Sequence, residues 1–304
     1  MVDEDLIKKS NLKLIADTMH GSGSKVLPEI LKDNLELEAK ILNNDRDPLF
    51  GGMLPDPSES NLDLMKNEIL KNNLDLGVAL DGDADRFGVI DGKGIFISPN
   101  NVIPMILYHL LKTRKFDHSD IAVRTVATTH LIDEICRKNK IKLLETPVGF
   151  KYIGMEMLNN NVIIGGEESG GYGFRGHMPE RDGILAGLYF LDLMVKTGKK
   201  PSELLAYLYS KVGPHYYKRV DIEFIAQERE NIINRIKSNM PDAIDGVKIV
   251  KSSAADGFRY VLADTSWLLI RFSGTEPVLR IYTETDSQTR ADRMLELGKK
   301  LAGV

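Results

Sequence analysis

The sequence predicts an α/β protein with two similar mixed-sheet α/β domains followed by a smaller α+β domain at the C-terminal end. Two stretches share one plan: LKLIADTMHGSGSKVLPEILKD (12–33) and DIAVRTVATTHLIDEICRKN (120–139) each read as an apolar strand, a polar turn with a histidine, and an amphipathic helix. Strands that alternate with helical patterns indicate α/β units. After Gly213 the pattern changes to several strands with two helices. We therefore expect domains at 1–94, 95–213 and 214–304.

The elements follow this plan along the chain. In the first domain the strand patterns after the repeated unit are LDLGVAL (74–80) and FGVI (87–90), and the turn-rich DGKGIFISPNN (91–101) ends it. In the second domain the corresponding strands are IKLLE (141–145) and VIIGG (162–166). Apolar residues at helical spacing predict helices over 181–198, stopped by Gly198, and over 201–213, started by Pro201.

The C-terminal domain has a different pattern of predicted elements, with more strands than helices. The predicted strands are RVDIEF, GVKIV, FRYVLA, SWLLIRF and VLRIYTET, and the predicted helices are QERENIINRIKSNM and SQTRADRMLELGKKL. Several strands with a helix near each end indicate an α+β arrangement.

Composition excludes several classes of protein. The 304 residues are 42% hydrophobic and 28% charged with a net charge of −4, a globular balance without the basic excess of a nucleic-acid-binding protein. The single cysteine, Cys136, excludes an internal disulfide and fits a reducing cytoplasm. The N-terminus has acids where a signal peptide carries positive charge, and no apolar run approaches a membrane span. We expect a cytoplasmic chain with neither nucleic-acid nor membrane partners.

The stretch LDGDADRFGVID (80–91) places Asp81, Asp83 and Asp85 at alternate positions after an apolar strand and then adds Arg86. Close carboxylates repel one another, and a hard divalent cation such as Mg²⁺, which prefers oxygen ligands, offsets that repulsion. An acidic surface turn is the alternative. A calcium-binding EF-hand loop fails because its sixth position would be Arg86 instead of glycine and its twelfth Gly92 instead of glutamate. Arg86 suits a phosphate that arrives on the metal.

A second loop, GGEESGGYGFRGHMPERDGI (165–184), follows the apolar strand residues VII (162–164). Its glycines let the backbone approach a ligand closely, and Glu167 and Ser169 carry groups that hydrogen-bond sugar hydroxyls. A glycine-rich surface turn is the alternative. Lys151 lies upstream in TPVGFKYIG (146–154), and taken alone it reads as a solvated surface lysine.

A third loop, RFSGTEPVLRIYTE (271–284), joins two predicted strands. Hydroxyls, freely oriented amides and two arginines in one loop are typical of an anion site, and a plain strand hairpin is the alternative. The residues concerned are Arg271, Ser273, Gly274, Thr275 and Arg280.

In this order, DGDADR, GEESGG and RFSGTEP resemble the α-D-phosphohexomutase family of phosphoglucomutases and phosphomannomutases. The resemblance covers essentially the whole chain, including IADTMHGSGS and TPVGFKYIG. It implies that the aspartate loop binds Mg²⁺, that Glu167 and Ser169 hold the sugar, and that the third loop grips the non-reacting phosphate. It also implies that Lys151 lies near the transferred phosphate as a general acid or base. We expect Lys151 and Arg86 to be the catalytic residues of this chain. It assigns no role to His177.

The family's first domain carries a phosphorylated serine in a loop like Thr-Ala-Ser-His-Asn-Pro, and no such loop occurs in this chain. TVATTHLID (125–133) lacks Ser-His, and Ser22 and Ser24 in HGSGS match the opening of the family's second domain. We therefore expect a truncated chain that covers family domains 2 to 4, lacks the catalytic serine and is inactive alone.

For the intact enzyme the resemblance implies interconversion of hexose 1-phosphate and hexose 6-phosphate through a phosphoserine and a hexose 1,6-bisphosphate, for glucose, mannose or both. Gly-Glu-Glu-Ser-Gly-Gly is closer to the phosphoglucomutase form than to that of phosphoglucosamine mutases. Two alternatives stay open. A sugar-phosphate sensor could be built on mutase domains, and a haloacid-dehalogenase-like phosphotransferase could use Asp81 as nucleophile, although that site expects Thr or Val at position 85.

Overall fold

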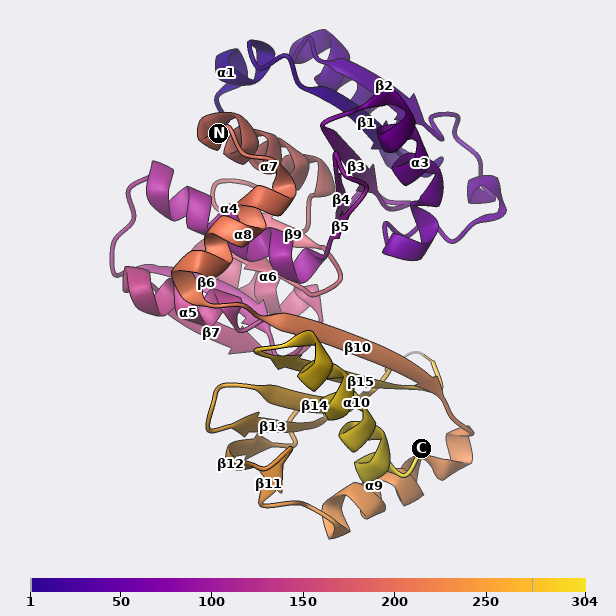
Figure 1. Ribbon diagram of the computed structural model, residues 1–304, viewed down its shortest axis with the longest axis vertical. Helices are drawn as coiled ribbons and strands as arrows, with labels where there is room; N and C mark the ends of the chain where they lie inside the picture. Colours follow the sequence, from indigo (N-terminus) through magenta and orange to yellow (C-terminus); the bar gives the residue numbers. More distant parts are fainter. Residues whose placement is uncertain (1, 275) are drawn as a thin grey trace. The chain divides into compact units, whose positions relative to one another are not determined.

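The structure is a computed structural model that describes residues 2–274 and 276–304. The chain divides into two compact units. The first comprises Met1–Thr128 and Ile132–Lys211, and the second comprises Thr129–Leu131 and Val212–Val304. The fold class predicted from the sequence is confirmed, and Figure 1 colours the elements in chain order. The domain boundaries expected at 94/95 and 213/214 stay a prediction.

The first unit contains two sheets with one strand order. The first sheet runs β2-β1-β3-β4-β5 and the second runs β7-β6-β8-β9. In both, a central strand pairs in parallel with two neighbours, and the next strand is antiparallel. The strands are β1 (Lys13–Asp17), β2 (Glu38–Leu42), β3 (Leu76–Leu80), β4 (Phe87–Asp91), β5 (Phe96–Ile97), β6 (Asp120–Thr125), β7 (Lys142–Thr146), β8 (Asn161–Gly166) and β9 (Tyr172–Phe174).

This shared order makes β3 and β8 equivalent strands of the two sheets. Asp81 directly follows β3 and Glu167 directly follows β8. Both strands are buried almost throughout, so each loop begins at the end of a strand that is held in the core. Ligands of α/β folds collect at the carboxyl ends of the strands, and the repeat therefore places two candidate ligand-binding loops at equivalent strand ends.

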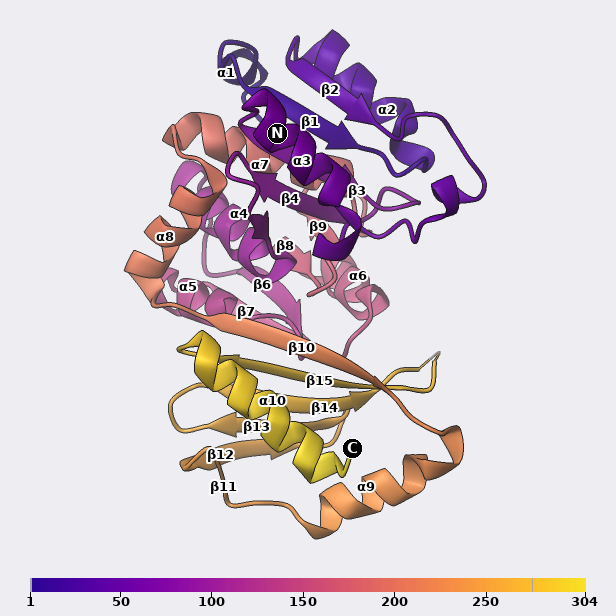
Figure 2. The same cartoon turned by 45° about the vertical axis from the view of Figure 1, so that its right-hand side comes forward.

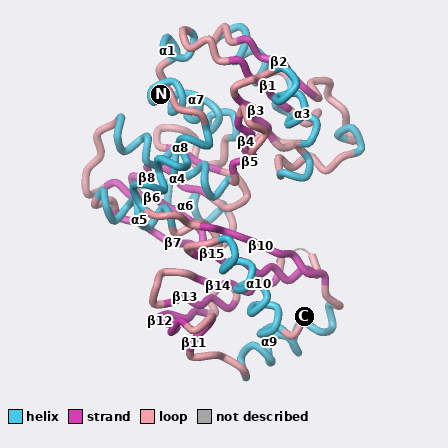
Figure 3. The backbone as a smooth tube through the Cα atoms, viewed as in Figure 1, coloured by secondary structure: helices cyan, strands magenta, loops and turns pink. Residues whose placement is uncertain are grey.

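Helices alternate with these strands, as Figure 3 shows by colour. They are α1 (Glu4–Lys8), α2 (Val26–Pro28), α3 (Asp63–Asn72), α4 (Pro99–Thr113), α5 (Leu131–Asn139), α6 (Phe150–Asn159), α7 (Gly183–Thr197) and α8 (Pro201–Val212). The helix predicted before residue 33 is irregular: a single α-helical turn, α2, is followed by a π-helical segment, Glu29–Asn34. Pro28 is the last residue of α2 and directly precedes the π-helical segment. None of the helices in the described chain is long and apolar enough to cross a membrane.

The second unit is one antiparallel sheet with two helices. Its strand order is β10-β15-β14-β13-β12-β11. The elements are β10 (Tyr216–Glu223), α9 (Arg229–Ser238), β11 (Ala243–Ile244), β12 (Val247–Ser253), β13 (Phe258–Leu262), β14 (Trp267–Phe272), β15 (Val278–Thr285) and α10 (Gln288–Ala302). Figure 2 shows α10 lying across the strands. A Cβ on Gly298 of α10 would lie 2.6 Å from Ile281 of β15, so glycine allows this close packing.

Candidate functional site

The aspartate loop is a tight curl at the end of β3. Asp81 is buried, and its Oδ1 accepts hydrogen bonds from the amides of Asp85 and Arg86 at 2.9 and 3.0 Å. Ala84 takes a positive φ of 65°, which turns the chain back on itself. Oxygen atoms of Asp81, Asp83 and Asp85 consequently lie within 4.8 Å of one another. The structure thus brings the three predicted metal ligands together.

Crowding and burial make this loop electrostatically unfavourable without a cation. Burial, reinforced by Asp85 and Asp83, raises the pKa of Asp81 to about 7. Burial also raises the pKa of Asp85, whose Oδ1 is buried and accepts no hydrogen bond from the described residues. Hard carboxylate oxygens at this spacing, one of them without a hydrogen-bond donor, fit a small divalent cation such as Mg²⁺.

Arg86 lies against the loop that precedes α3. Its Nε is 3.5 Å from Asp81 Oδ2, and its Nη1 is 3.1 Å from Oδ1 of Asp56. The amide of Gly82 donates to the carbonyl of Pro55, so the same loop is also fixed through the backbone. No local pattern selects Asp56, which lies 25 residues before Asp81.

The candidate sugar loop (165–184) carries a buried carboxylate at its beginning. Glu167 Oε1 accepts a hydrogen bond of 3.0 Å from the amide of Gly149, which immediately precedes α6. Burial, with the neighbouring Glu168 charge, raises the pKa of Glu167 to about 7. Thr125, at the end of β6, donates to Glu168 Oε2 at 3.3 Å. Ser169 lies half-buried in the following turn.

The aspartate and sugar loops meet through the backbone. The amide of Phe87 donates to the carbonyl of Gly170 at 3.1 Å, and Arg86 forms an antiparallel bridge with Gly171. Gly170 has a φ of 96°, and a Cβ there would lie 3.0 Å from the carbonyl oxygen of Phe87. A side chain at this position would therefore strain the contact.

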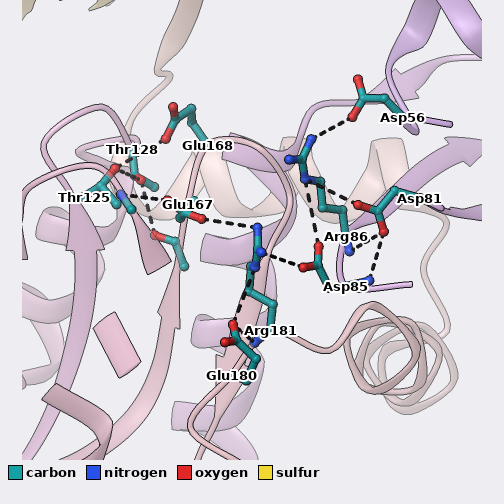
Figure 4. Close-up of polar contacts among 12 residues, drawn as sticks. Asp56, Asp81, Asp85, Arg86, Thr125, Thr128, Glu167, Glu168, Glu180 and Arg181 are labelled. Atoms are coloured by element: carbon teal, nitrogen blue, oxygen red, sulfur yellow. Dashed lines mark hydrogen bonds and ion pairs between the residues drawn. The ribbon is translucent and has the colours of Figure 1, made fainter. Parts of the chain in front are cut away.

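Arg181 joins the two loops through its side chain, as Figure 4 shows. Its Nη2 is 2.6 Å from Asp85 Oδ2 and its Nη1 is 3.8 Å from Glu167 Oε2. The Arg181 side chain packs against Gly171, where a Cβ would lie only 2.2 Å from Arg181 Cδ. Sequence reasoning missed Arg181. The available signal was an arginine inside a loop that already carried the candidate sugar ligands Glu167 and Ser169.

Lys151 and His177 lie at the edge of this arrangement. Lys151 is exposed in the first turn of α6, with its Nζ 5.0 Å from the ring centre of Tyr152. His177 Nε2 is 2.8 Å from Oδ2 of Asp182, whose other oxygen caps α7 by accepting from the amide of Leu185. His177 thus has a structural partner at the start of α7.

The candidate phosphate loop (271–284) lies in the second unit and is built on the β14–β15 hairpin. Arg271 of β14 and Arg280 of β15 are cross-strand partners. Arg271 Nε is 2.8 Å from Asp256 Oδ1, and Arg280 is 3.3 Å from Glu276 and 3.5 Å from Asp221. Ser273 is buried and its amide closes the hairpin on Val278, while Gly274 is exposed. Thr275 lies outside the described residues.

Comparison with known families matches three consecutive domain models over most of the chain. They are the phosphoglucomutase/phosphomannomutase alpha/beta/alpha domain II at residues 1–94, alpha/beta/alpha domain III at 98–212 and the C-terminal domain at 235–297. The chain belongs to the phosphoglucomutase/phosphomannomutase family. This membership confirms the resemblance drawn from the three loops and removes the haloacid-dehalogenase-like alternative.

Individual relatives agree with the family. The chain is 34% identical to a phosphoglucomutase/phosphomannomutase of Thermococcus kodakarensis, covering 99% of this chain and 62% of that protein. It is 31% identical to a probable phosphoglucosamine mutase of Methanococcoides burtonii, covering 97% of this chain and 63% of that protein. The crystal structure of a putative phosphomannomutase from Thermus thermophilus is similar at a TM-score of 0.83 and 31% identity, covering 100% of this chain and 63% of that one. The chain therefore spans about three-fifths of the length of these relatives.

Proposed function

We propose that this chain supplies the metal, sugar and phosphate sites of a phosphohexomutase that interconverts hexose 1-phosphate and hexose 6-phosphate, with glucose, mannose or both as the sugar. The observation that carries the proposal is the meeting of the aspartate and sugar loops. Backbone bonds between residues 86–87 and 170–171, together with Arg181, hold three metal-ligand candidates beside the candidate sugar ligand Glu167.

Each group has a role in this proposal. Glu167 and Ser169 hydrogen-bond sugar hydroxyls and so fix the orientation of the ring. Arg271 and Arg280, with Ser273, Gly274 and Thr275, bind the phosphate that does not react, so that binding remote from the reacting centre positions the substrate. Lys151 moves a proton at the sugar oxygen that gains or loses the phosphoryl group.

Two arginines complete the charge balance around the reacting phosphoryl group. Asp85 lies between Arg86 and Arg181, and both guanidinium groups have planar forks that suit phosphate oxygens (Figure 4). Bound to Asp81, Asp83 and Asp85, Mg²⁺ would supply further neutralisation of the charge that develops on the phosphoryl oxygens. Arg181 holds Asp85 in place for that cation.

The nucleophile is the part of the reaction that this chain does not contain. No Thr-Ala-Ser-His-Asn-Pro-like loop occurs in the sequence, so we propose that a phosphoserine on a separate domain donates the phosphoryl group and that the chain alone does not turn over. The alternative is a sugar-phosphate-binding protein without catalysis. Between the sugars, the Gly-Glu-Glu-Ser-Gly-Gly sequence favours glucose over glucosamine.

A binding and turnover experiment on one preparation tests this proposal. NMR titration with glucose 6-phosphate should shift amides of the phosphate loop, and glucose, the uncharged control, should leave those amides in place. A coupled assay on glucose 1-phosphate with Mg²⁺ and glucose 1,6-bisphosphate should show no turnover above a blank. Turnover by the pure chain would require another nucleophile, and equal binding of both sugars would refute the phosphate site.

A further inference from the structure

A cavity of about 220 Å³ lies among α4, α7 and α8 of the first unit. Figures 1 and 2 both show these three helices side by side. None of the described residues that line it comes from the aspartate or sugar loop. Its wall is apolar and aromatic, formed mainly by Met105, Tyr108, Leu193, Leu204, Tyr207 and Leu208.

Two residues that line the helical cavity, His109 and Lys196, are bonded to Asp192, which does not line it. His109 is buried, and its Nε2 is 2.8 Å from Oδ2 of the buried Asp192. Lys196 Nζ and the amide of Asp3 also donate to Asp192, each at 2.9 Å. Although burial acts in the opposite direction, hydrogen bonds from His109 and Lys196 lower the pKa of Asp192 to about 2. The carboxylate is therefore charged and already bonded within the protein.

Lysines lie at and around the helical cavity, and of these Lys112 and Lys196 line it. Lys112 Nζ lies 5.2 Å from the ring centre of Tyr108. Within the described chain, the hydrogen bond that Lys112 makes goes to Asn139 Oδ1 at a long 3.4 Å, although an ammonium group has three donors. Lys199 and Lys211 approach the ring of Tyr207 at 5.8 and 5.0 Å. No described residue that lines the cavity carries a carboxylate.

We propose that the helical cavity binds a small aromatic monocarboxylate, with its ring among the leucines and its carboxylate at Lys112. The volume of the cavity fits such a ligand. An apolar cavity of about 150 Å³ in another protein holds benzene, so this cavity of about 220 Å³ has room for a ring with a short side chain. The positive charge of Lys112, with no lining carboxylate among the described residues, favours an anion over a neutral molecule or a cation.

Phenylacetate is the probe, and 2-phenylacetamide is its uncharged control of the same shape. In a methyl-labelled chain, the methyl signals of Met105 and Leu204 should shift saturably with phenylacetate at about millimolar affinity. The amide should bind about three- to tenfold more weakly because it lacks the charged partner of Lys112. Equal affinities, or no saturable shift with phenylacetate, would overturn the proposal.

Variants locate the site. Lys112→Gln should bring the affinity for phenylacetate down to that for the amide, whereas Lys71→Gln should leave both unchanged, since Lys71 occupies the equivalent last turn of α3. Leu204→Phe fills the cavity and should abolish binding. If Leu204→Phe does not fold, the affinities of Lys112→Gln for phenylacetate and 2-phenylacetamide still test the proposal. Lys112 is exposed, so its replacement should not unfold the chain. An unchanged preference for the acid in Lys112→Gln would contradict the assignment.

Discussion

The aspartate–sugar site of the first unit and the phosphate loop of the second unit handle charge in opposite ways. In the first, burial raises the pKa values of Asp81 and Glu167 to about 7, and Asp85 Oδ1 accepts no hydrogen bond from the described residues. In the second, Arg271 is already paired with Asp256, and Arg280 with Glu276 and Asp221. The first site therefore gains most from an added cation. In the second site, a bound phosphate must replace the carboxylates that already pair with Arg271 and Arg280.

The largest expected effect is on Arg181, the cation shared by the two loops of the first site. Arg181→Gln leaves Asp85 and Glu167 without it, and we expect the first unit to lose about 2–4 kcal/mol of unfolding free energy. The single tryptophan, Trp267, lies in the second unit, so its fluorescence would not report unfolding of the first unit. Hydrogen exchange of the Phe87 amide, which lies in the first unit, measures the effect instead.

Arg137→Gln is the matched control for Arg181→Gln. Arg137 forms a surface pair with Glu134 within α5 and its side chain is 67% exposed, so its loss should cost less than about 0.5 kcal/mol. Mg²⁺ should restore part of the loss in Arg181→Gln by supplying positive charge at Asp85. Equal exchange rates in the two variants would show that Arg181 does not couple the loops.

Next in size is the metal. Asp83→Asn removes one charged oxygen ligand from the group of three, and we expect Mg²⁺ or Mn²⁺ affinity to fall about tenfold or more. Mn²⁺ resonance or calorimetry measures it. Asp33→Asn, a substitution in the π-helical segment after α2, should leave the affinity unchanged. The same affinity in all three proteins would remove the aspartate loop as the metal site.

For the phosphate loop, Arg271→Ala should lower the affinity for glucose 6-phosphate about tenfold, because a hydrogen bond to a charged group contributes about 1.5–3 kcal/mol and part of that is recovered when Asp256 is released. Mg²⁺ affinity should not change. NMR titration measures both. Arg293→Ala is the control, since Arg293 pairs with Asp245 at the start of the β11–β12 turn. A similar loss in Arg293→Ala would mean that binding responds to net charge alone.

The smallest effect is a pH dependence at Glu167. In the unfolded chain this carboxyl ionises near 4.5, and in the folded chain its pKa is about 7. Between these values the folded chain binds more protons, so stability should fall as pH rises from about 4.5 to about 7 and then level off.

Glu167→Gln removes this carboxyl's part of the slope and leaves the part that comes from Asp81, so its pH profile should be flatter than that of wild type. The variant should become more stable than wild type by about 1–2 kcal/mol at pH 8. Urea denaturation across this pH range measures it. Glu29→Gln, at an exposed carboxylate, should keep the wild-type slope. Parallel pH profiles for wild type and Glu167→Gln would contradict the buried state of this group.

The fold and the three loops could be predicted because their signals are local. A run such as Asp81 to Arg86 carries its spacing in the sequence, and the repeated strand–turn–helix plan predicted two equivalent sheets. Arg181 could not be predicted in the same way, since it lies 96 residues after Asp85 and reaches it only because Gly171 lacks a side chain. Asp56 likewise depends on a long loop whose path no local pattern determines. The irregular helix near Pro28 shows the reverse case, in which an amphipathic pattern predicted a helix but not its π-helical geometry over Glu29–Asn34.

The central claim is that the aspartate and sugar loops form one metal-responsive site. NMR titration with Mg²⁺ tests it most directly, through the amides of Asp85 and Arg86, which donate to Asp81, and through those of Phe87 and Gly149, which donate to Gly170 and Glu167. We predict that all four amides shift with one Mg²⁺ midpoint, and that Arg181→Gln uncouples Gly149 from the rest. If Asp85 and Arg86 shift while Phe87 and Gly149 stay in place in the wild-type chain, the two loops are separate and the account is wrong.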